Sequence, residues 1–234
     1  MRRICIIGDS HVAALKAAAP DVLRAYPDRE IAFFAAKTSL TGDAKVEGGA
    51  LVAGSAALRK FWEATSGGLS RIEPVFDHYV VCGLGLKIKA AMAAMLATGE
   101  TGRDTLLDSK IANTLAAATL SRLRGLTDAP VLLIAEPFPS HDITPKLTAR
   151  LRRDEQEKAA ATFFGARMSH FARRHGAAFM PQPVQTVSAN GLMTLPLYGV
   201  GRPYLVDFQG EDDHSHMNAA YGAIVLTAAL DLIG

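Results

Sequence analysis

Short apolar runs alternate with longer amphipathic stretches along this chain of 234 residues. The short runs are rich in β-branched and aromatic side chains, which is typical of buried strands. They are residues 4–7, 30–36, 79–82, 130–136 and 177–180. Between them apolar residues recur at helical spacing, as in residues 12–26 and 55–65. This β-α alternation predicts a parallel sheet with helices on both faces and right-handed crossovers.

Several segments depart from simple alternation. Residues 86–127 predict two Ala- and Leu-rich helices, which is more chain than one crossover needs. We interpret this elaboration as scaffold, with a lid or a dimer surface as alternatives. Residues 144–176 predict one helix, and the Gly-, Ser- and Thr-rich residues 38–54 predict a loop. Residues 181–213 predict a long loop that is apolar enough to pack down as one wall of a substrate pocket.

Composition indicates one α/β domain over residues 1–234, because 49% of the residues are hydrophobic and nothing suggests disorder. A formal charge of +2 gives no electrostatic case for nucleic acid or a membrane surface. The apolar run at residues 4–7 is too short for a signal peptide, so we expect a cytoplasmic protein. Cys5 and Cys82 lie in predicted strands and are expected to be buried hydrophobes.

Candidate chemistry begins at the end of the first strand, in Gly8-Asp9-Ser10. The carboxyl ends of parallel strands carry the active sites of open α/β sheets. Backbone N–H groups at the following helix would also stabilise negative charge beside Ser10. Ser10 is therefore a candidate nucleophile, and its alternative role is the N-cap of the next helix.

A second candidate block, Asp213 to His216, directly precedes the last amphipathic segment. A serine nucleophile needs a base, and the base needs a partner that fixes its tautomer. His216 and Asp213 could supply these roles, although His214 is a second candidate base. A solvated loop that caps the helix is the alternative interpretation. The closely spaced His214 and His216 are the one local hint of a metal site in the sequence. Because a metal site needs more clustered ligands than these two, we predict no metal, and we also predict no cofactor.

The two blocks together resemble those of the SGNH (GDSL-type) hydrolases, and they span nearly the whole chain. The resemblance implies a three-layer α/β/α fold with a parallel, flavodoxin-like five-stranded sheet. It also implies that Ser10 is the nucleophile, His216 the base and Asp213 the residue that orients the base.

Two further features of the family concern the oxyanion hole. The resemblance implies N–H donors from Ser10 and from a glycine after the second strand, for which Gly42 is the candidate and Gly48 and Gly49 are rivals. The family's oxyanion-binding asparagine after the third strand is replaced here by Gly85. Loss of one such donor can cost about 2.7–4 kcal/mol of transition-state stabilisation. Two candidates for a replacement donor are His11 and Asn190.

We therefore predict a serine-dependent esterase or acyl hydrolase that acts on a small-molecule or saccharide ester, and the resemblance implies a short acyl group. His11, Asn190 and Tyr198 are candidate substrate-binding residues. The same triad would serve an acyltransferase if a sugar hydroxyl replaced water. Because the asparagine is missing, a non-catalytic ligand-binding protein stays an alternative. The sequence leaves assembly into a homo-oligomer open.

Overall fold

A computed structural model describes residues 1–97, 99–140, 145–153, 155–200 and 215–234 of the chain. Its centre is a five-stranded sheet in the order β2-β1-β6-β7-β8, in which every neighbouring pair is parallel. These strands are β1 (Arg2–Gly8), β2 (Arg29–Ala35), β6 (His78–Cys82), β7 (Val131–Ile134) and β8 (Ala178–Met180). The order is that of flavodoxin-like sheets. The predicted fold class is therefore confirmed.

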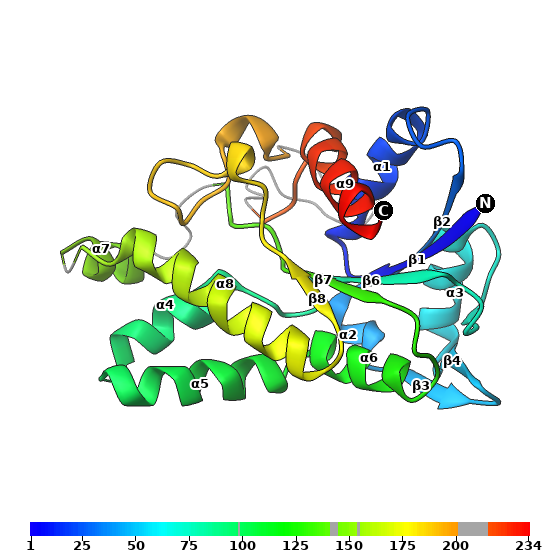
Figure 1. The fold of residues 1–234 in the computed structure, drawn as a ribbon, viewed down its shortest axis with the longest axis horizontal. Helices are drawn as coiled ribbons and strands as arrows, with labels where there is room; N and C mark the ends of the chain where they lie inside the picture. The colour runs from blue at the N-terminus through cyan, green and yellow to red at the C-terminus, as the bar shows by residue number, and fades with distance from the viewer. Residues whose placement is uncertain (98, 141–144, 154, 201–214) are drawn as a thin grey trace.

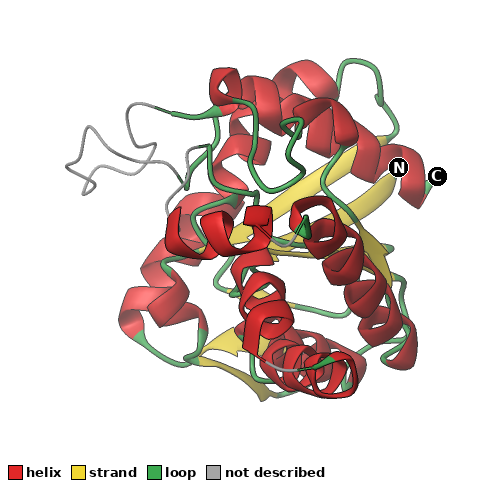
Figure 2. Ribbon diagram, turned by 90° about the vertical axis from the view of Figure 1, so that its left-hand side faces the viewer, coloured by secondary structure: helices red, strands yellow, loops and turns green. Residues whose placement is uncertain are grey.

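Helices cover both faces of this sheet, and the alternation of side chains along β1 shows why. Ile4 and Ile6 pack into one core with α1 (Val12–Val22) and α9 (Ala219–Ile233), whereas Cys5 and Ile7 face the opposite core. Successive side chains of a strand point to opposite faces, so an all-apolar strand requires cover on both. Figure 1 shows α1 and α9 on one side of the sheet and the remaining long helices on the other. Figure 2 shows the strands passing between these two layers.

The second helical layer is larger than the first. Its members are α3 (Ala56–Ser66), α4 (Ile88–Ala97), α5 (Glu100–Ala112), α6 (Leu115–Arg124), α7 (Pro145–Arg153) and α8 (Glu157–Arg174). Their buried side chains join one continuous apolar cluster beneath the sheet. Two short 3-10 helices, Val184–Thr186 and Pro196–Tyr198, follow β8. Among the described helices, none is long and apolar enough to cross a membrane.

The last helix is held tightly against the first, and this contact brings the two ends of the chain together. A side chain at Gly222 of α9 would collide with the backbone carbonyl of Ala14 in α1. Asn218 caps α9 by accepting a hydrogen bond from the Tyr221 N–H at 3.1 Å. Its side-chain amide also donates to the Leu197 carbonyl at 2.8 Å. The segment that carries His216 is thereby fixed beside the start of α1.

The structure corrects three predictions of local structure. Residues 38–54 are not all loop, because they contain α2 (Thr38–Thr41), β3 (Ala44–Glu47) and β4 (Ala50–Ala53), which form a small antiparallel sheet with β5 (Arg71–Ile72). Gly48 and Gly49, with φ of 57° and 72°, form the two-residue hairpin turn. Residues 86–127 contain three helices instead of two. Residues 144–176 contain two helices instead of one, and Glu155 between them has a φ of 55° that no helix allows.

Candidate active site

The carboxyl ends of β1, β6 and β7 meet at one edge of the sheet, and the turn after β1 requires a glycine. A Cβ at Gly8 would lie 2.5 Å from the Val12 side chain and would also collide with the carbonyl oxygen of Cys82. The absence of a side chain lets β1 pass close to β6 and lets the chain turn directly into α1. This turn presents Asp9, Ser10 and His11 in succession.

Asp9 is 1% exposed and joins three loops of the site. Its carboxylate accepts hydrogen bonds from the Leu84 N–H at 2.8 Å and from the His11 N–H at 3.2 Å. The Thr38 hydroxyl, from the segment after β2, donates to it at 3.2 Å. A Cβ at Gly83 would lie 2.5 Å from an Asp9 carboxylate oxygen, so this glycine makes room for the carboxylate. Asp9 therefore fixes the loops after β1, β2 and β6 relative to one another.

Ser10 and His216 meet although they lie at opposite ends of the chain. The His216 Nε2 atom lies 2.6 Å from the Ser10 Oγ atom. Ser10 is placed by the turn after β1, and His216 is placed by the segment that leads into α9. A neutral imidazole at this distance can accept the hydroxyl proton of a serine.

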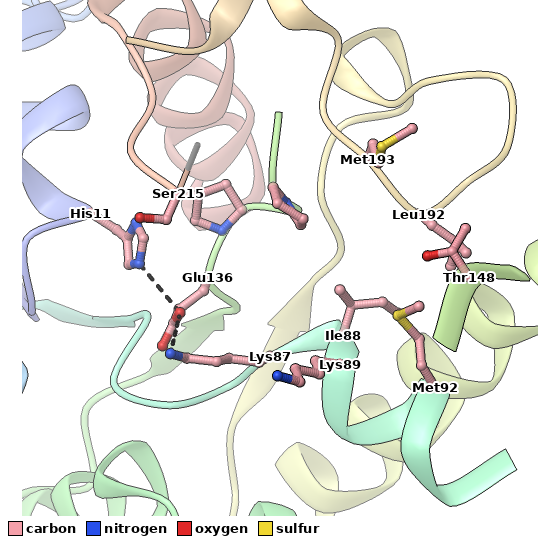
Figure 3. A pocket seen from close by; sticks show the side chains of 12 residues that line it. His11, Lys87, Ile88, Lys89, Met92, Glu136, Thr148, Leu192, Met193 and Ser215 are labelled. Atoms are coloured by element: carbon pink, nitrogen blue, oxygen red, sulfur yellow. Dashed lines mark ion pairs between the residues drawn. The ribbon is translucent and has the colours of Figure 1, made fainter. Parts of the chain in front are cut away.

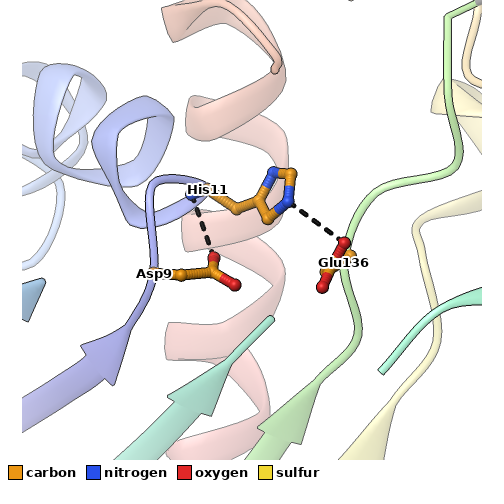
Figure 4. Close-up of side chains that lie close together, drawn as sticks. All are labelled: Asp9, His11 and Glu136. Atoms are coloured by element: carbon orange, nitrogen blue, oxygen red, sulfur yellow. Dashed lines mark hydrogen bonds and ion pairs between the residues drawn. The ribbon is translucent and has the colours of Figure 1, made fainter. Parts of the chain in front are cut away.

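A buried charged group lies beside this pair, and Figure 4 shows two of its members, His11 and Glu136. The His11 Nε2 atom lies 3.3 Å from a carboxylate oxygen of Glu136, which follows β7. Lys87 Nζ approaches the same carboxylate at 3.3 Å, and the Gly85 N–H donates to its other oxygen at 2.9 Å. The His11 and His216 rings are stacked, with their centroids 5.1 Å apart.

The environment makes an ion pair of His11 and Glu136. Burial lowers the pKa of His11, but the hydrogen bond to Glu136 and the negative charges of Asp9 and Glu136 outweigh burial and raise the pKa above its usual value. Burial likewise raises the pKa of Glu136, yet His11, Lys87 and the Gly85 N–H together bring that pKa below its usual value. Both shifts favour the charged forms near neutral pH.

A cavity of about 250 Å³ opens beside His11 (Figure 3). Its polar wall contains His11, Glu136, Lys87, Lys89 and Ser215. Opposite this wall lie apolar side chains, among them those of Met92, Leu192 and Met193. Leu192 and Met193 belong to the segment after β8. The cavity therefore combines a charged side with an apolar side.

Three side chains at this site could contribute metal ligands. Asp9, His11 and Glu136 each offer one ligand atom, and these atoms lie within 4.8 Å of one another. The Asp9 oxygens already accept backbone N–H groups, and His11 Nε2 is paired with Glu136. Hydrogen bonding and charge pairing account for this cluster, and we assign it no metal.

The other residues predicted to bind the oxyanion or the substrate are Gly42, Gly85, Asn190 and Tyr198, and each has a contact within the protein. Gly42 ends α2, and its N–H donates to the Leu40 carbonyl. Gly85 lies in the loop after β6 with a φ of 92°, and its N–H is occupied by Glu136. Asn190 uses its side-chain oxygen in a local turn, where it accepts from the Leu192 N–H at 3.0 Å. Tyr198 packs edge-on against Tyr221, with ring centroids 6.2 Å apart.

Asp213 and His214 lie outside the described residues. Of the two candidate bases, His216 is described, and its Nε2 atom faces Ser10. The rival glycines Gly48 and Gly49 form the β3–β4 turn, where a Cβ added to either would meet nothing within 4 Å. The structure thus brings Ser10, His11 and His216 together and leaves these two glycines in a separate hairpin.

Glu136 and Thr38 are among the contributors to the site that the sequence analysis did not single out. Glu136 is the first polar residue after the apolar core of β7, and a carboxylate at the end of a parallel strand was an available signal. Thr38 follows β2 in the same way, but a lone threonine in a polar loop carries little information. Asp9 was seen only as part of the turn, although its burial makes it the link between three loops.

Comparisons with known proteins identify the fold. No protein-family model and no curated protein matches the sequence. Among solved structures, an extracellular lipase from Streptomyces rimosus superposes with a TM-score of 0.56 at 15% identity, over 100% of both chains. The chain has the SGNH (GDSL-type) hydrolase fold.

Other structures that match this SGNH fold are more distant. An acetylxylan esterase from Geobacillus stearothermophilus, as a catalytic mutant, gives a TM-score of 0.47 at 13% identity, over 100% of this chain and 94% of that chain. A lipase from a goat rumen metagenome gives a TM-score of 0.45 at 10% identity, over 100% of this chain and 98% of that chain.

Proposed function

We propose that this protein is a serine-dependent ester hydrolase with Ser10 as the nucleophile and His216 as the base. The observation that carries the proposal is the 2.6 Å approach of His216 Nε2 to Ser10 Oγ at the carboxyl edge of a parallel sheet. Asp213, three residues before His216, is proposed to orient the imidazole and stabilise its protonated form. The Streptomyces rimosus protein with which the chain shares its fold is a lipase, which agrees with ester cleavage.

The reaction would proceed in two halves. Ser10 Oγ attacks the ester carbonyl carbon while its proton moves to His216 Nε2. The tetrahedral intermediate collapses, the carbon–oxygen bond to the alcohol breaks, and the alcohol leaves with the proton from His216. Water then attacks the acyl-enzyme, His216 takes the water proton, and the acid leaves as Ser10 regains a proton. No group is consumed other than the ester and one water.

The oxyanion hole is the unusual part of this proposal. Gly85 supplies no side-chain donor, and its own N–H is occupied by Glu136. We assign the Ser10 N–H, at the start of the turn into α1, as the donor closest to the reacting carbonyl. A hole with fewer donors predicts slow turnover, since one donor contributes about 2.7–4 kcal/mol in other hydrolases.

The first test is hydrolysis of p-nitrophenyl acetate by the wild type and by Ser10→Ala, each checked for folding by circular dichroism. We expect the rate to fall at least about 10³-fold in the folded variant. Equal rates in the two proteins would refute the proposal. They would favour a non-catalytic ligand-binding protein, the alternative that the side-chain-free Gly85 supports.

An acyltransferase would use the same residues, so the acceptor decides between the two reactions. Inclusion of a sugar alcohol in the assay distinguishes them, because a transferase forms an acylated sugar at the expense of free acid. For a hydrolase we expect free acid as the main product. The alcohol half of the natural substrate is proposed to be small or carbohydrate-like, because the cavity beside His11 has a charged and polar wall.

A further inference from the structure

A second cavity is lined by Ser10 and lies at the β2 edge of the sheet. It has a volume of about 420 Å³ and lies between α1 and α3, across the carboxyl end of the edge strand β2. We call it the α1–α3 groove and define it by Ser10, Ala13, Lys16, Ala17, Pro20 and Phe61. Its volume is within the range of about 300–1,000 Å³ that is typical of ligand sites. The nucleophile itself forms one end of the groove.

The groove offers mainly carbon atoms to a ligand, because its charged and hydroxyl side chains, Asp9, Lys16 and Thr65, are paired with protein atoms. Lys16 Nζ donates to the Thr65 carbonyl at 2.7 Å and thereby connects α1 to the last turn of α3. The Thr65 hydroxyl lies 2.8 Å from the Phe61 carbonyl and accepts from the Ala35 N–H at 3.1 Å. A ligand in the groove therefore meets methyl groups, a proline ring and an aromatic ring.

The cavity beside His11 has a charged wall, whereas the α1–α3 groove is lined mainly by carbon atoms. The reaction indicates which part of an ester each of them would bind. The acyl group stays bonded to Ser10 Oγ after the first half of the reaction, and Ser10 lines the α1–α3 groove. The alcohol must receive its proton from His216 Nε2, and the His216 ring is stacked on His11, which belongs to the charged wall of the His11 cavity. The alcohol would thus leave toward the His11 cavity, while the acyl group would lie along α1.

From this arrangement we propose that the α1–α3 groove binds the acyl chain of the substrate, and that this chain is an unbranched, medium-length hydrocarbon. The proposal rests on the proposed ester hydrolysis and specifies its substrate. From Val12 to Pro20 the groove follows α1 for about 12 Å, at 1.5 Å per residue. An acetyl group would leave most of that length empty. A medium-chain acyl group would fill it and bury its methylenes against Ala13, Ala17 and Phe61.

The first experiment compares kcat/KM for p-nitrophenyl acetate and p-nitrophenyl octanoate. Each buried methylene contributes up to about fourfold to affinity, so the wild type is expected to prefer the octanoate by at least about tenfold. Ala17→Trp fills the groove from an exposed position of α1, and Ala17→Phe does so with a smaller ring. Both should lower kcat/KM for the octanoate at least about tenfold more than for the acetate.

Ala25→Trp is the matched control, because Ala25 is also exposed, lies just beyond α1 and does not line the groove. It should leave both esters unaffected. Octanoate hydrolysis that is unchanged by Ala17→Trp, or equal losses on the two esters, would overturn the assignment of the groove.

A binding experiment separates this proposal from the proposed hydrolysis. Folded Ser10→Ala is titrated with octanoate by calorimetry, with and without the added Ala17→Trp substitution. If Ser10→Ala binds octanoate and Ala17→Trp weakens this binding at least about tenfold, the groove is supported as the acyl site. This holds even if the wild type hydrolyses neither ester, and in that case only the catalytic proposal fails. Binding that is absent, or that is insensitive to Ala17→Trp, overturns the groove as an acyl site whatever the esterase assays show.

Discussion

Replacement of Asp9 should both destabilise the protein and disable the site, because one buried carboxylate joins three loops. Its oxygens accept from the N–H groups of Leu84 and His11 and from the Thr38 hydroxyl. In Asp9→Ala these donors lose their acceptor, and among them the Leu84 N–H is buried. Asp9→Asn keeps the shape and one acceptor oxygen but loses the charge.

The expected magnitude follows from the bonds that are lost. A buried donor left without a partner costs about 1–3 kcal/mol. Leu84 has a φ of 54°, a conformation that a non-glycine residue keeps only when its surroundings impose it. We therefore expect Asp9→Ala to lower the free energy of unfolding by about 4 kcal/mol and Asp9→Asn by about 2 kcal/mol. For a protein of this size, the larger loss corresponds to a decrease in Tm of roughly 8–16 °C.

Thermal and urea unfolding monitored by circular dichroism measure these losses. The matched control is Asp77→Ala, since Asp77 also accepts a backbone N–H, that of Arg3 at 2.7 Å, but is exposed to solvent. The control should cost less than about 1 kcal/mol, because water can replace an exposed acceptor. Displacement of the loops should also reduce esterase kcat/KM by about 100-fold in Asp9→Asn. Equal losses for Asp9→Ala and Asp77→Ala would refute the idea that Asp9 holds the loops together.

Other consequences of the site can be tested separately. Glu136→Gln removes a partner that raises the pKa of His11. An NMR titration of the His11 ring should therefore show a lower midpoint in this variant than in the wild type. An unchanged midpoint would contradict the ion pair between His11 and Glu136. Because folding raises the pKa of His11 and lowers that of Glu136, the stabilisation by this pair is greatest between the two pKa values. The difference in unfolding free energy between the wild type and Glu136→Gln should thus shrink as pH rises through the pKa of folded His11, and a pH series of urea melts checks this sign. Gly8→Ala should lower the free energy of unfolding by at least about 1–3 kcal/mol, because its methyl group would collide with the Cys82 carbonyl. Gly165→Ala is the control, because Gly165 lies inside α8 and a Cβ there would meet nothing within 4 Å, so this variant should not destabilise the protein. Equal Tm values for the two variants would contradict the collision at Gly8.

The sequence predicted the architecture well because the strands are almost uniformly apolar. Ile4 to Ile7 face a helical layer on each side, so the pattern alone indicates a sheet covered on both faces. The expected pairing of Ser10 with His216 rested on two short blocks at opposite ends of the chain. The close approach of α9 to α1 at Gly222 provides the physical reason that the two ends meet.

Other features depended on tertiary contacts that no local pattern encodes. The pairing of His11 with Glu136 joins residues that are far apart in sequence, and only the adjacency of β1, β6 and β7 brings them together. The β3–β4 hairpin had a readable signal, because the Gly48-Gly49 pair is typical of a two-residue turn. The strands on either side of it are only four residues long, which is too short to show a clear alternating pattern. The helix break at Glu155 has no proline or glycine to announce it.

Covalent labelling can show directly whether Ser10 is a nucleophile activated by His216. The wild type is incubated with a fluorophosphonate, which reacts with serine hydroxyls activated by a base, and the modified residue is located by peptide mass spectrometry. We expect one adduct, on Ser10, that forms at least about 10³-fold more slowly in folded His216→Gln. Absence of labelling at Ser10, or labelling at an equal rate in His216→Gln, would contradict the assignment of Ser10 and His216 as nucleophile and base.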